Sequence, residues 1–267
     1  MDAQLLIICL LTAIINLIGT LAYSARIAGV RTRRIAMSFA LFNILVLVSR
    51  TSNSFLGPFL AKRIEVRIAQ GGGDALLGDF RMVLLSASLA VAIGIVLVPT
   101  GQRVFARAIG YFQQHRSTTR MIMRTATPAG LRMIRQAVTV PHPRQLRELL
   151  RPRGVGFGVL LANCLAQALI TVGVLASLYA GYLNPEFRVT ASQLSAVING
   201  FATILLFALI DPQLSVMTDD VVDGRISEAL FRRTVLWISV SRLAGTLLAQ
   251  ILFLPSATAI AWVANHV

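Results

Sequence analysis

The chain has 267 residues, of which 56% are hydrophobic and 13% are charged, and its mean hydropathy is +0.73. Soluble domains carry about 25% charged residues, so this composition excludes an ordinary soluble protein and indicates a chain that crosses a membrane several times. The formal net charge of +14 comes from arginines that are not interleaved with aromatic residues, which argues against nucleic acid as a partner and for anionic membrane lipids.

The first apolar stretch, residues 3–23, is long enough to cross a bilayer core of about 30 Å as a helix. Thr12, Asn16 and Thr20 recur every four residues within it and would share one helix face. Such a face serves either to hydrogen-bond a neighbouring helix or to line a polar cavity, and the sequence leaves both interpretations open.

The predicted first loop carries four arginines and no acidic residue: Arg26, Arg31, Arg33 and Arg34. Arginine binds phosphate through two parallel hydrogen bonds and keeps its charge in a medium of low dielectric constant. This loop is therefore a candidate site for the capture of a phosphate-bearing lipid.

A second span is expected to begin near Ile35, and it contains three candidate binding residues, Asn43, Arg50 and Asn53. The helical rise places Asn43 about 12 Å into the span, where we expect it to be buried. Arg50 would lie near the far interface. There its guanidinium either reaches the headgroups or lines a wet crevice together with Asn53 and the neighbouring serines and threonines.

The sequence is less regular between residues 57 and 153. Pro58 is expected to open or bend a short amphipathic helix, and glycines 71–73 are expected to form a flexible turn. A third span, residues 82–98, should end at Pro99. Residues 102–153 carry many arginines beside two apolar stripes, which predicts a basic amphipathic segment in the cytoplasmic headgroup layer.

Three further spans are predicted at residues 155–183, 190–210 and 234–254. The fourth and fifth again carry polar residues four apart, including Gln167 and Asn199. Asp211 and Pro212 are expected to close the fifth span, and Pro255 is expected to close the sixth. The tail after residue 257 is too short to cross the bilayer.

Arg242 is the most unusual single residue, because it is expected near the middle of the sixth span. A charge near the bilayer centre costs at least about 2.5–3.5 kcal/mol, so an arginine there normally faces protein or water and has a partner. The sequence offers two partners for Arg242, either Asp211 or a phosphate of the substrate.

No metal or cofactor site is expected. Cys9 and Cys164 lie in apolar runs and are interpreted as small buried hydrophobic residues, and the three histidines are scattered. The cluster of Asp219, Asp220 and Asp223 is interpreted as a solvated acidic helix end, although such clusters also bind Mg²⁺ in membrane phosphotransferases.

These features predict an all-α, polytopic membrane helical bundle, with about six transmembrane helices plus interfacial amphipathic helices. Residues 1–267 form a single transmembrane domain that includes the basic segment 102–153. Most basic residues fall in the first, third and fifth loops, which places those loops in the cytoplasm and both termini outside. Three spans in each half permit an inverted repeat.

Two segments, LAYSARIAGVRTRR at residues 21–34 and ALFNILVLVSRTSN at residues 40–53, resemble the Amj family of bacterial lipid II flippases, the alternates to MurJ. The resemblance implies a multi-pass protein of the bacterial plasma membrane with a role in cell-wall assembly. It implies movement of the undecaprenyl-pyrophosphate-linked peptidoglycan precursor from the inner to the outer leaflet. The residue assignments above rest on charge and position, not on the family.

Three hypotheses follow. The first is a flippase without enzymatic activity, in which the loop arginines capture the diphosphate before it passes Arg242 and Arg50. The second is a membrane enzyme that acts on a phospholipid or polyprenyl phosphate through the aspartate cluster. The third is a scaffold subunit whose arginines only contact anionic lipid. The sequence leaves a homo-oligomer open in each case.

Overall fold

The computed structural model describes residues 2–69, 74–115, 127–139 and 154–267, and these residues form helices without any strand. Six helical segments in the described ranges are long and apolar enough to cross a membrane. The prediction of an all-α, multi-span membrane protein is therefore confirmed.

The first helix, α1 (Ala3–Thr32), is longer than predicted. Asp2 caps its start by accepting a hydrogen bond from the backbone nitrogen of Leu5 at 2.9 Å. Arg33 ends it in the left-handed region, with φ 53°. Consequently Arg26 and Arg31 are helical, and the prediction that all four arginines lie in a loop was wrong. Polar and charged residues can belong to a transmembrane helix when neighbouring helices shield them from lipid.

Three prolines that were expected to end or open helices lie inside them. The second helix, α2 (Ile35–Ala69), continues through Pro58, and α3 (Asp74–His115) continues through Pro99. The last helix, α10 (Glu228–Ala264), continues through Pro255 and so includes most of the C-terminal tail. Helices in a membrane tolerate proline because neighbouring groups satisfy the carbonyls that it leaves free, and because lipid offers an unpaired backbone no alternative.

The segment 102–153 is only partly described. Its first part, up to His115, is the end of α3, and a short helix, α5 (Pro128–Ala137), follows. The chain after α5 is attached to α3 at Thr139, whose backbone nitrogen donates to Thr100 Oγ1 at 3.0 Å. The remainder of the predicted basic segment lies outside the described residues.

The C-terminal part begins with α7 (Phe157–Leu183) and α8 (Arg188–Leu205). A single π-helical turn, η1 (Leu206–Ile210), then joins α8 to α9 (Asp211–Val222). The fifth span therefore does not close at Asp211 and Pro212 as predicted. Pro212 lies in the first turn of α9, where its missing N–H group costs little.

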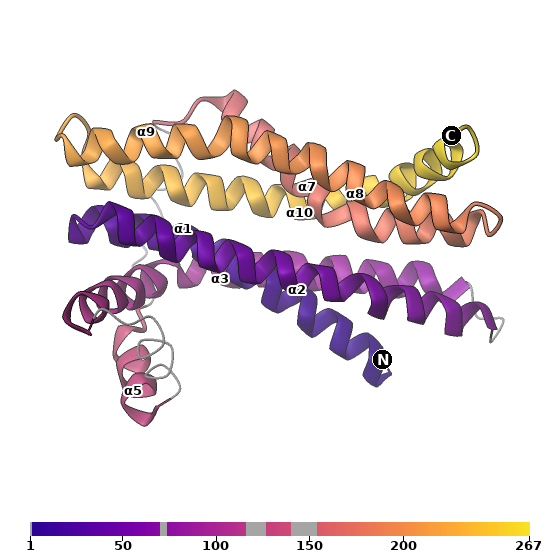
Figure 1. The fold of residues 1–267 in the computed structure, drawn as a ribbon, viewed down its shortest axis with the longest axis horizontal. Coiled ribbons are helices and arrows are strands. Elements are labelled where there is room, and N and C mark those ends of the chain that lie inside the picture. The colour runs from indigo at the N-terminus through magenta and orange to yellow at the C-terminus, as the bar shows by residue number, and fades with distance from the viewer. Residues whose placement is uncertain (1, 70–73, 116–126, 140–153) are drawn as a thin grey trace.

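The long helices form two halves that lie side by side (Figure 1). In the N-terminal half α1 packs against both α2 and α3, and in the C-terminal half α7 packs against both α8 and α10. The two halves meet mainly where α3 contacts α10. Each half therefore contains three spans, and in each half the first span packs against both of the others. This shared packing order is compatible with the 3+3 inverted repeat that the number of spans permits.

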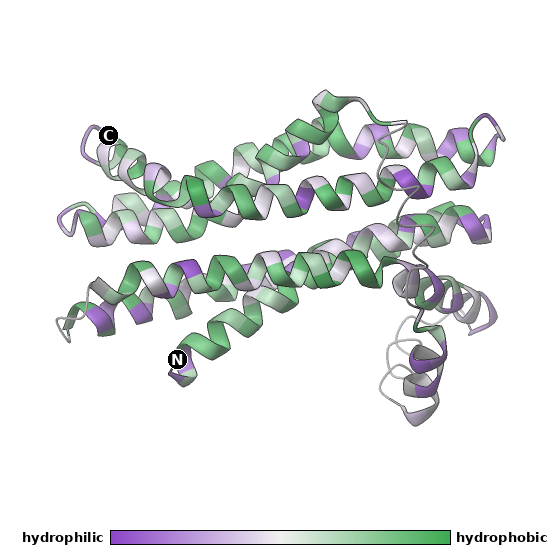
Figure 2. Cartoon of the chain, turned by 180° about the vertical axis from the view of Figure 1, so that it is seen from behind, coloured by the Kyte–Doolittle hydropathy of each residue, from purple (hydrophilic) through white to green (hydrophobic). Residues whose placement is uncertain are grey.

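The bundle has two distinct ends, as Figure 1 shows. At one end α1 and α3 finish, α10 begins and α5 lies nearby; this end is called the basic end below. Both chain termini lie at the other end, called the terminal end. Hydrophobic residues dominate the long helices, and hydrophilic residues are concentrated in α5 and near the helix ends (Figure 2). The cytoplasmic location of the basic end stays a prediction.

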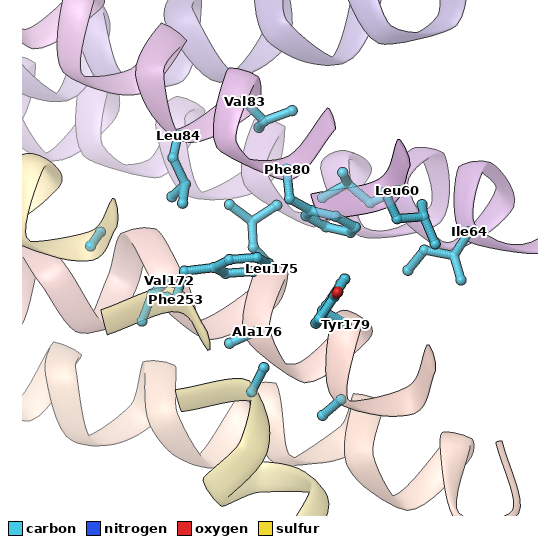
Figure 3. Packing of buried hydrophobic residues seen from close by; sticks show 14 of the residues in the cluster. Leu60, Ile64, Phe80, Val83, Leu84, Val172, Leu175, Ala176, Tyr179 and Phe253 are labelled. Carbon is cyan, nitrogen blue, oxygen red and sulfur yellow. The ribbon is translucent and has the colours of Figure 1, made fainter. Parts of the chain in front are cut away.

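Each end of the bundle has its own apolar core. At the terminal end Phe80 of α3 stacks on Phe253 of α10 at 5.6 Å between ring centroids, and Tyr179 of α7 contacts both rings (Figure 3). At the basic end Tyr23 packs on Phe42 among buried aliphatic residues of α1, α3, η1, α9 and α10. The space between these two cores holds the candidate site.

Candidate functional site

A cavity of about 280 Å³ lies between the two apolar cores, and every long helix contributes to its wall. The side facing the terminal end is apolar and includes Leu56, Val83 and Leu175. The remainder of the wall mixes polar side chains with apolar ones such as Phe42, Val46 and Ile170. Its polar side chains are Thr12, Asn16, Tyr23, Ser49, Arg50, Asn53, Gln167, Thr171, Asn199, Thr203, Asp211 and Arg242.

The polar residues at four-residue spacing serve both of the purposes that the sequence left open. Asn16, Gln167 and Asn199 line the cavity, on α1, α7 and α8 respectively. In contrast, Asn163 is fully buried and joins α7 to α10 by donating to the Ile238 carbonyl at 3.0 Å. The polar stripe on α7 therefore joins α7 to α10 at Asn163, and one turn later it presents the Gln167 amide to the cavity.

Arg242 extends from near the middle of α10 into this cavity. Its guanidinium lies against the backbone of Gly19, where an added Cβ atom would come within 2.7 Å of Nη2. Nη2 donates a long hydrogen bond of 3.4 Å to Asn16 Oδ1, and the buried Nε has no hydrogen-bond partner in the described part of the chain. No described carboxylate lies within 4 Å of this guanidinium. Asp211, one of the two predicted partners of Arg242, does not pair with it.

Asp211 pairs instead with Arg26 across the two halves. Arg26 Nη2 donates to Asp211 Oδ1 at 3.0 Å, and the arginine side chain is only 3% exposed. The rings of Phe39 and Phe42 cover the guanidinium at 4.7 and 4.4 Å. Asp211 and Phe42, which both contact the Arg26 guanidinium, line the cavity, and Arg26 itself does not.

Arg50 lies at the seam between the halves, on the side of α2 and α8. It is exposed, yet it lines the cavity and donates to Thr203 Oγ1 at 3.3 Å from Nη1. Its guanidinium also lies 5.2 Å from the centre of the Phe207 ring, which is exposed as well. Because Arg50 and Phe207 belong both to the cavity wall and to the bundle surface, the cavity reaches the surface between α2 and α8. Asn53 lines it one turn further along α2.

Five of the predicted site residues do not line the cavity, Arg26 among them. Asn43 is exposed on α2 and not buried as expected, because the inward face of α2 at that level is formed by Phe42 and Val46. Arg31, Arg33 and Arg34 are exposed at the basic end. These three positions agree with a role in attracting anions to that end, which stays a prediction.

The aspartate cluster has its own basic partner. Arg225 contacts Asp220 at 2.8 Å and Asp223 at 2.5 Å, and the hydrogen bond that Arg225 donates to Asp223 raises the pKa of Arg225. No group of three or more His, Cys, Asp or Glu side chains in the described ranges is arranged to hold a metal ion. The cluster is thus arranged as a charge-paired helix end.

Sequence reasoning missed a second buried arginine, at the terminal end. Arg63 is 4% exposed, and its Nε and Nη2 approach the same Asp79 oxygen at 2.8 and 2.7 Å. Its Nη1 donates to Asp2 Oδ1 at 2.7 Å, and this bond lowers the pKa of Asp2 to about 2. The available signal was the placement of Asp2 and Asp79 beside their apolar spans, but no local spacing connects these residues to Arg63.

The whole chain was compared with known proteins. The family described as "Amj: Alternate to MurJ" matches residues 11–264. The chain belongs to the Amj family. The predicted resemblance is therefore confirmed, and it extends well beyond the two segments on which it was based.

A curated relative supports this membership in the Amj family. "Lipid II flippase Amj" of Bacillus subtilis (strain 168) is 35% identical over 261 residues, which cover 97% of this chain and 96% of the relative. No solved structure matches the chain. The cavity described above is therefore interpreted from its own residues.

Proposed function

We propose that this Amj family member is a lipid II flippase of the bacterial inner membrane. It moves the undecaprenyl-pyrophosphate-linked peptidoglycan precursor from the inner to the outer leaflet. The relative named for this activity aligns over nearly the full length of the chain, and membrane-spanning helices account for most of the sequence. Moving a lipid between leaflets makes and breaks no covalent bond, so the chain acts as a transporter and not as an enzyme.

The observation that carries the proposal is that Arg242 lines the cavity and has no acidic partner among the described residues. A charge at this depth is expensive unless water or an anion solvates it. Its unpaired Nε and its weak bond to Asn16 leave several N–H groups available. A diphosphate carries one negative charge and several acceptor oxygens on each phosphate, so it matches these donors.

The rest of the cavity fits the other parts of this lipid. The amides of Asn16, Gln167 and Asn199 offer hydrogen-bond donors and acceptors to a sugar and peptide headgroup. The cavity is smaller than such a headgroup, so transport requires the two halves to separate further. The polyprenyl tail stays in lipid and passes the seam at Arg50, where exposed apolar side chains such as Phe207 lie beside polar ones.

The exposed arginines indicate a further partner, the anionic membrane lipids, and the charge of the cargo supplies a driving force. Arg31, Arg33 and Arg34 attract anionic lipids, lipid II among them, to a cytoplasmic basic end. Export of an anion from a cell with a negative interior is favourable by about 2.3 kcal/mol per charge per 100 mV. The membrane potential therefore favours transport in the outward direction.

The proposal is tested in cells that depend on this protein alone, by measuring how much lipid II is accessible in the outer leaflet. We expect Arg242→Ala to abolish accessibility and Arg242→Lys to retain only part of it, because an ammonium lacks the planar pair of donors. Gly19→Ala should also reduce accessibility, since its methyl group displaces the Arg242 guanidinium.

Two matched controls accompany these variants. Arg81→Ala removes an exposed arginine outside the cavity, and Gly78→Ala adds a methyl group where nothing lies within 4 Å. Both should behave like the wild type. Wild-type accessibility in an Arg50→Ala/Arg242→Ala double variant with normal expression would refute the proposed site.

A further inference from the structure

Arg26 is poorly satisfied for a buried cation. A guanidinium has five N–H groups, but Arg26 makes one hydrogen bond, to Asp211, and its Nε and Nη1 are buried without a partner in the described residues. A buried donor without a partner costs about 1–3 kcal/mol, and more when it is charged. The faces of two phenylalanine rings offset only part of this cost. Arg26 therefore has donors for more acceptor atoms than the single Asp211 oxygen that contacts it.

The backbone at Asp211 is irregular. The Asp211 nitrogen donates to the Leu206 carbonyl five residues earlier, which defines the π-helical turn η1. Pro212 has no N–H group with which to restore the regular pattern. Such turns occur mostly as single bulges inside helices and are common at functional sites. Asp211 therefore lies directly after a bulge, where a change in the turn would move its carboxylate relative to α1.

The charges near the cavity are unbalanced. Arg26, Arg50 and Arg242 face one carboxylate, that of Asp211, which leaves a formal surplus of two positive charges. The diphosphate of lipid II carries one negative charge on each phosphate, so it compensates more of the charge of the three arginines than the single carboxylate of Asp211 does. Asp211 is the one carboxylate among the described residues that line the cavity, and it is therefore the anion that an incoming diphosphate meets first.

We propose that Asp211 is a resident counter-anion for Arg26 and that the diphosphate replaces it on binding. The unpaired Nε and Nη1 of Arg26 then gain acceptors, and Asp211 leaves. The buried ion pair between α1 and α9, which connects the two halves at the basic end, is thereby lost. Substrate binding and release of the halves are then one event. This proposal rests on the proposed function, because it takes the diphosphate as the ligand.

The test uses the full-length protein in detergent and titrates it with inorganic pyrophosphate in a calorimeter. Removing the competing carboxylate should strengthen binding, so Asp211→Asn is expected to bind pyrophosphate about tenfold more tightly, which corresponds to about 1.4 kcal/mol. Asp211→Ser is a second neutral variant for the case in which Asp211→Asn does not fold. Arg26→Gln/Asp211→Asn should lose the gain, and Asp211→Glu should bind like the wild type.

Asp220→Asn is the matched control, because it removes a paired aspartate from the same helix outside the cavity. It should leave pyrophosphate affinity unchanged. If the wild type binds and folded neutral Asp211 variants bind equally or more weakly, the pair is only structural and this proposal is overturned while the flippase proposal stands. If no variant binds and the wild type exposes no lipid II in the outer leaflet, the proposed function and this proposal both fail.

Discussion

Two buried arginine–aspartate pairs, at opposite ends of the same bundle, are built differently. At the terminal end three nitrogens of Arg63 contact two aspartates, Asp79 and Asp2, at 2.7–2.8 Å. All three residues belong to the N-terminal half, so the pair stays intact when the halves move. At the basic end one nitrogen of Arg26 contacts Asp211 at 3.0 Å, and this pair crosses from one half to the other.

The difference separates a structural ion pair from one that is suited to break. A buried arginine costs least when all of its donors have acceptors, as Arg63 nearly achieves. Arg26 keeps two donors unpaired and has a partner beside a π-helical turn at the cavity wall. Four predictions test this contrast, in order of decreasing effect.

The largest effect is expected for Arg63→Ala. Removing this guanidinium leaves Asp79, which is only 11% exposed, without its main partner, and breaking a buried pair in this way costs about 3 kcal/mol or more. We expect a corresponding loss in the free energy of unfolding in detergent, measured by denaturant titration. A loss below about 1 kcal/mol would mean that the pair is not structural.

A double-mutant cycle on Arg26 and Asp211 should show a smaller coupling, of about 1.5 kcal/mol, because one charged hydrogen bond is at stake. The variants are Arg26→Gln, Asp211→Asn and their combination, and unfolding is measured as for Arg63. The corresponding cycle on Arg63 and Asp79 provides the reference. A coupling energy for Arg26 and Asp211 equal to or above that reference would contradict the difference between the two pairs.

The next effect depends on pH. Arg63 lowers the pKa of Asp2 from 3.8 to about 2, so the carboxylate adds stability above pH 3.8 and loses it as the pH falls toward 2. The thermal midpoint of Asp2→Asn should therefore lie below that of the wild type at neutral pH. The gap should close between pH 4 and pH 2. A gap that is independent of pH would show that the Asp2 charge plays no part.

The smallest effect is expected for the exposed pair between Glu65 of α2 and Arg188 of α8, at 2.6 Å. It also joins the two halves, but both side chains are about half exposed, and such pairs contribute at most about 1 kcal/mol. Glu65→Gln should change unfolding by less than that amount, and added salt should abolish the difference. A larger change would mean that this pair helps to hold the two halves together at the terminal end.

Composition and periodicity were sufficient for the architecture. Six apolar stretches, an arginine excess in alternate loops and polar residues four apart predicted an all-α membrane bundle with polar inner faces, and the structure contains these helices. The helix ends were predicted poorly at Pro58, Pro99, Pro255 and Asp211. Proline and charge normally end a helix because water offers the chain an alternative, and lipid does not.

The candidate site was only partly foreseeable. Arg50, Asn53, Asp211 and Arg242 were selected because polar groups in apolar spans are costly, and all four line the cavity. Asn43 met the same criterion but faces outward, since a pattern along one helix does not say which face meets the other helices.

What the sequence by itself determined is the class of protein, the family and the presence of charges that need partners. Only the tertiary structure decided which partner each charge has. It pairs Arg26 with Asp211 and Arg63 with Asp79, and among the described residues it gives Arg242, which faces the cavity, no acidic partner. The physical reason is that a desolvated charge is compensated by whatever group folding brings within about 3 Å, and that group can lie anywhere in the chain.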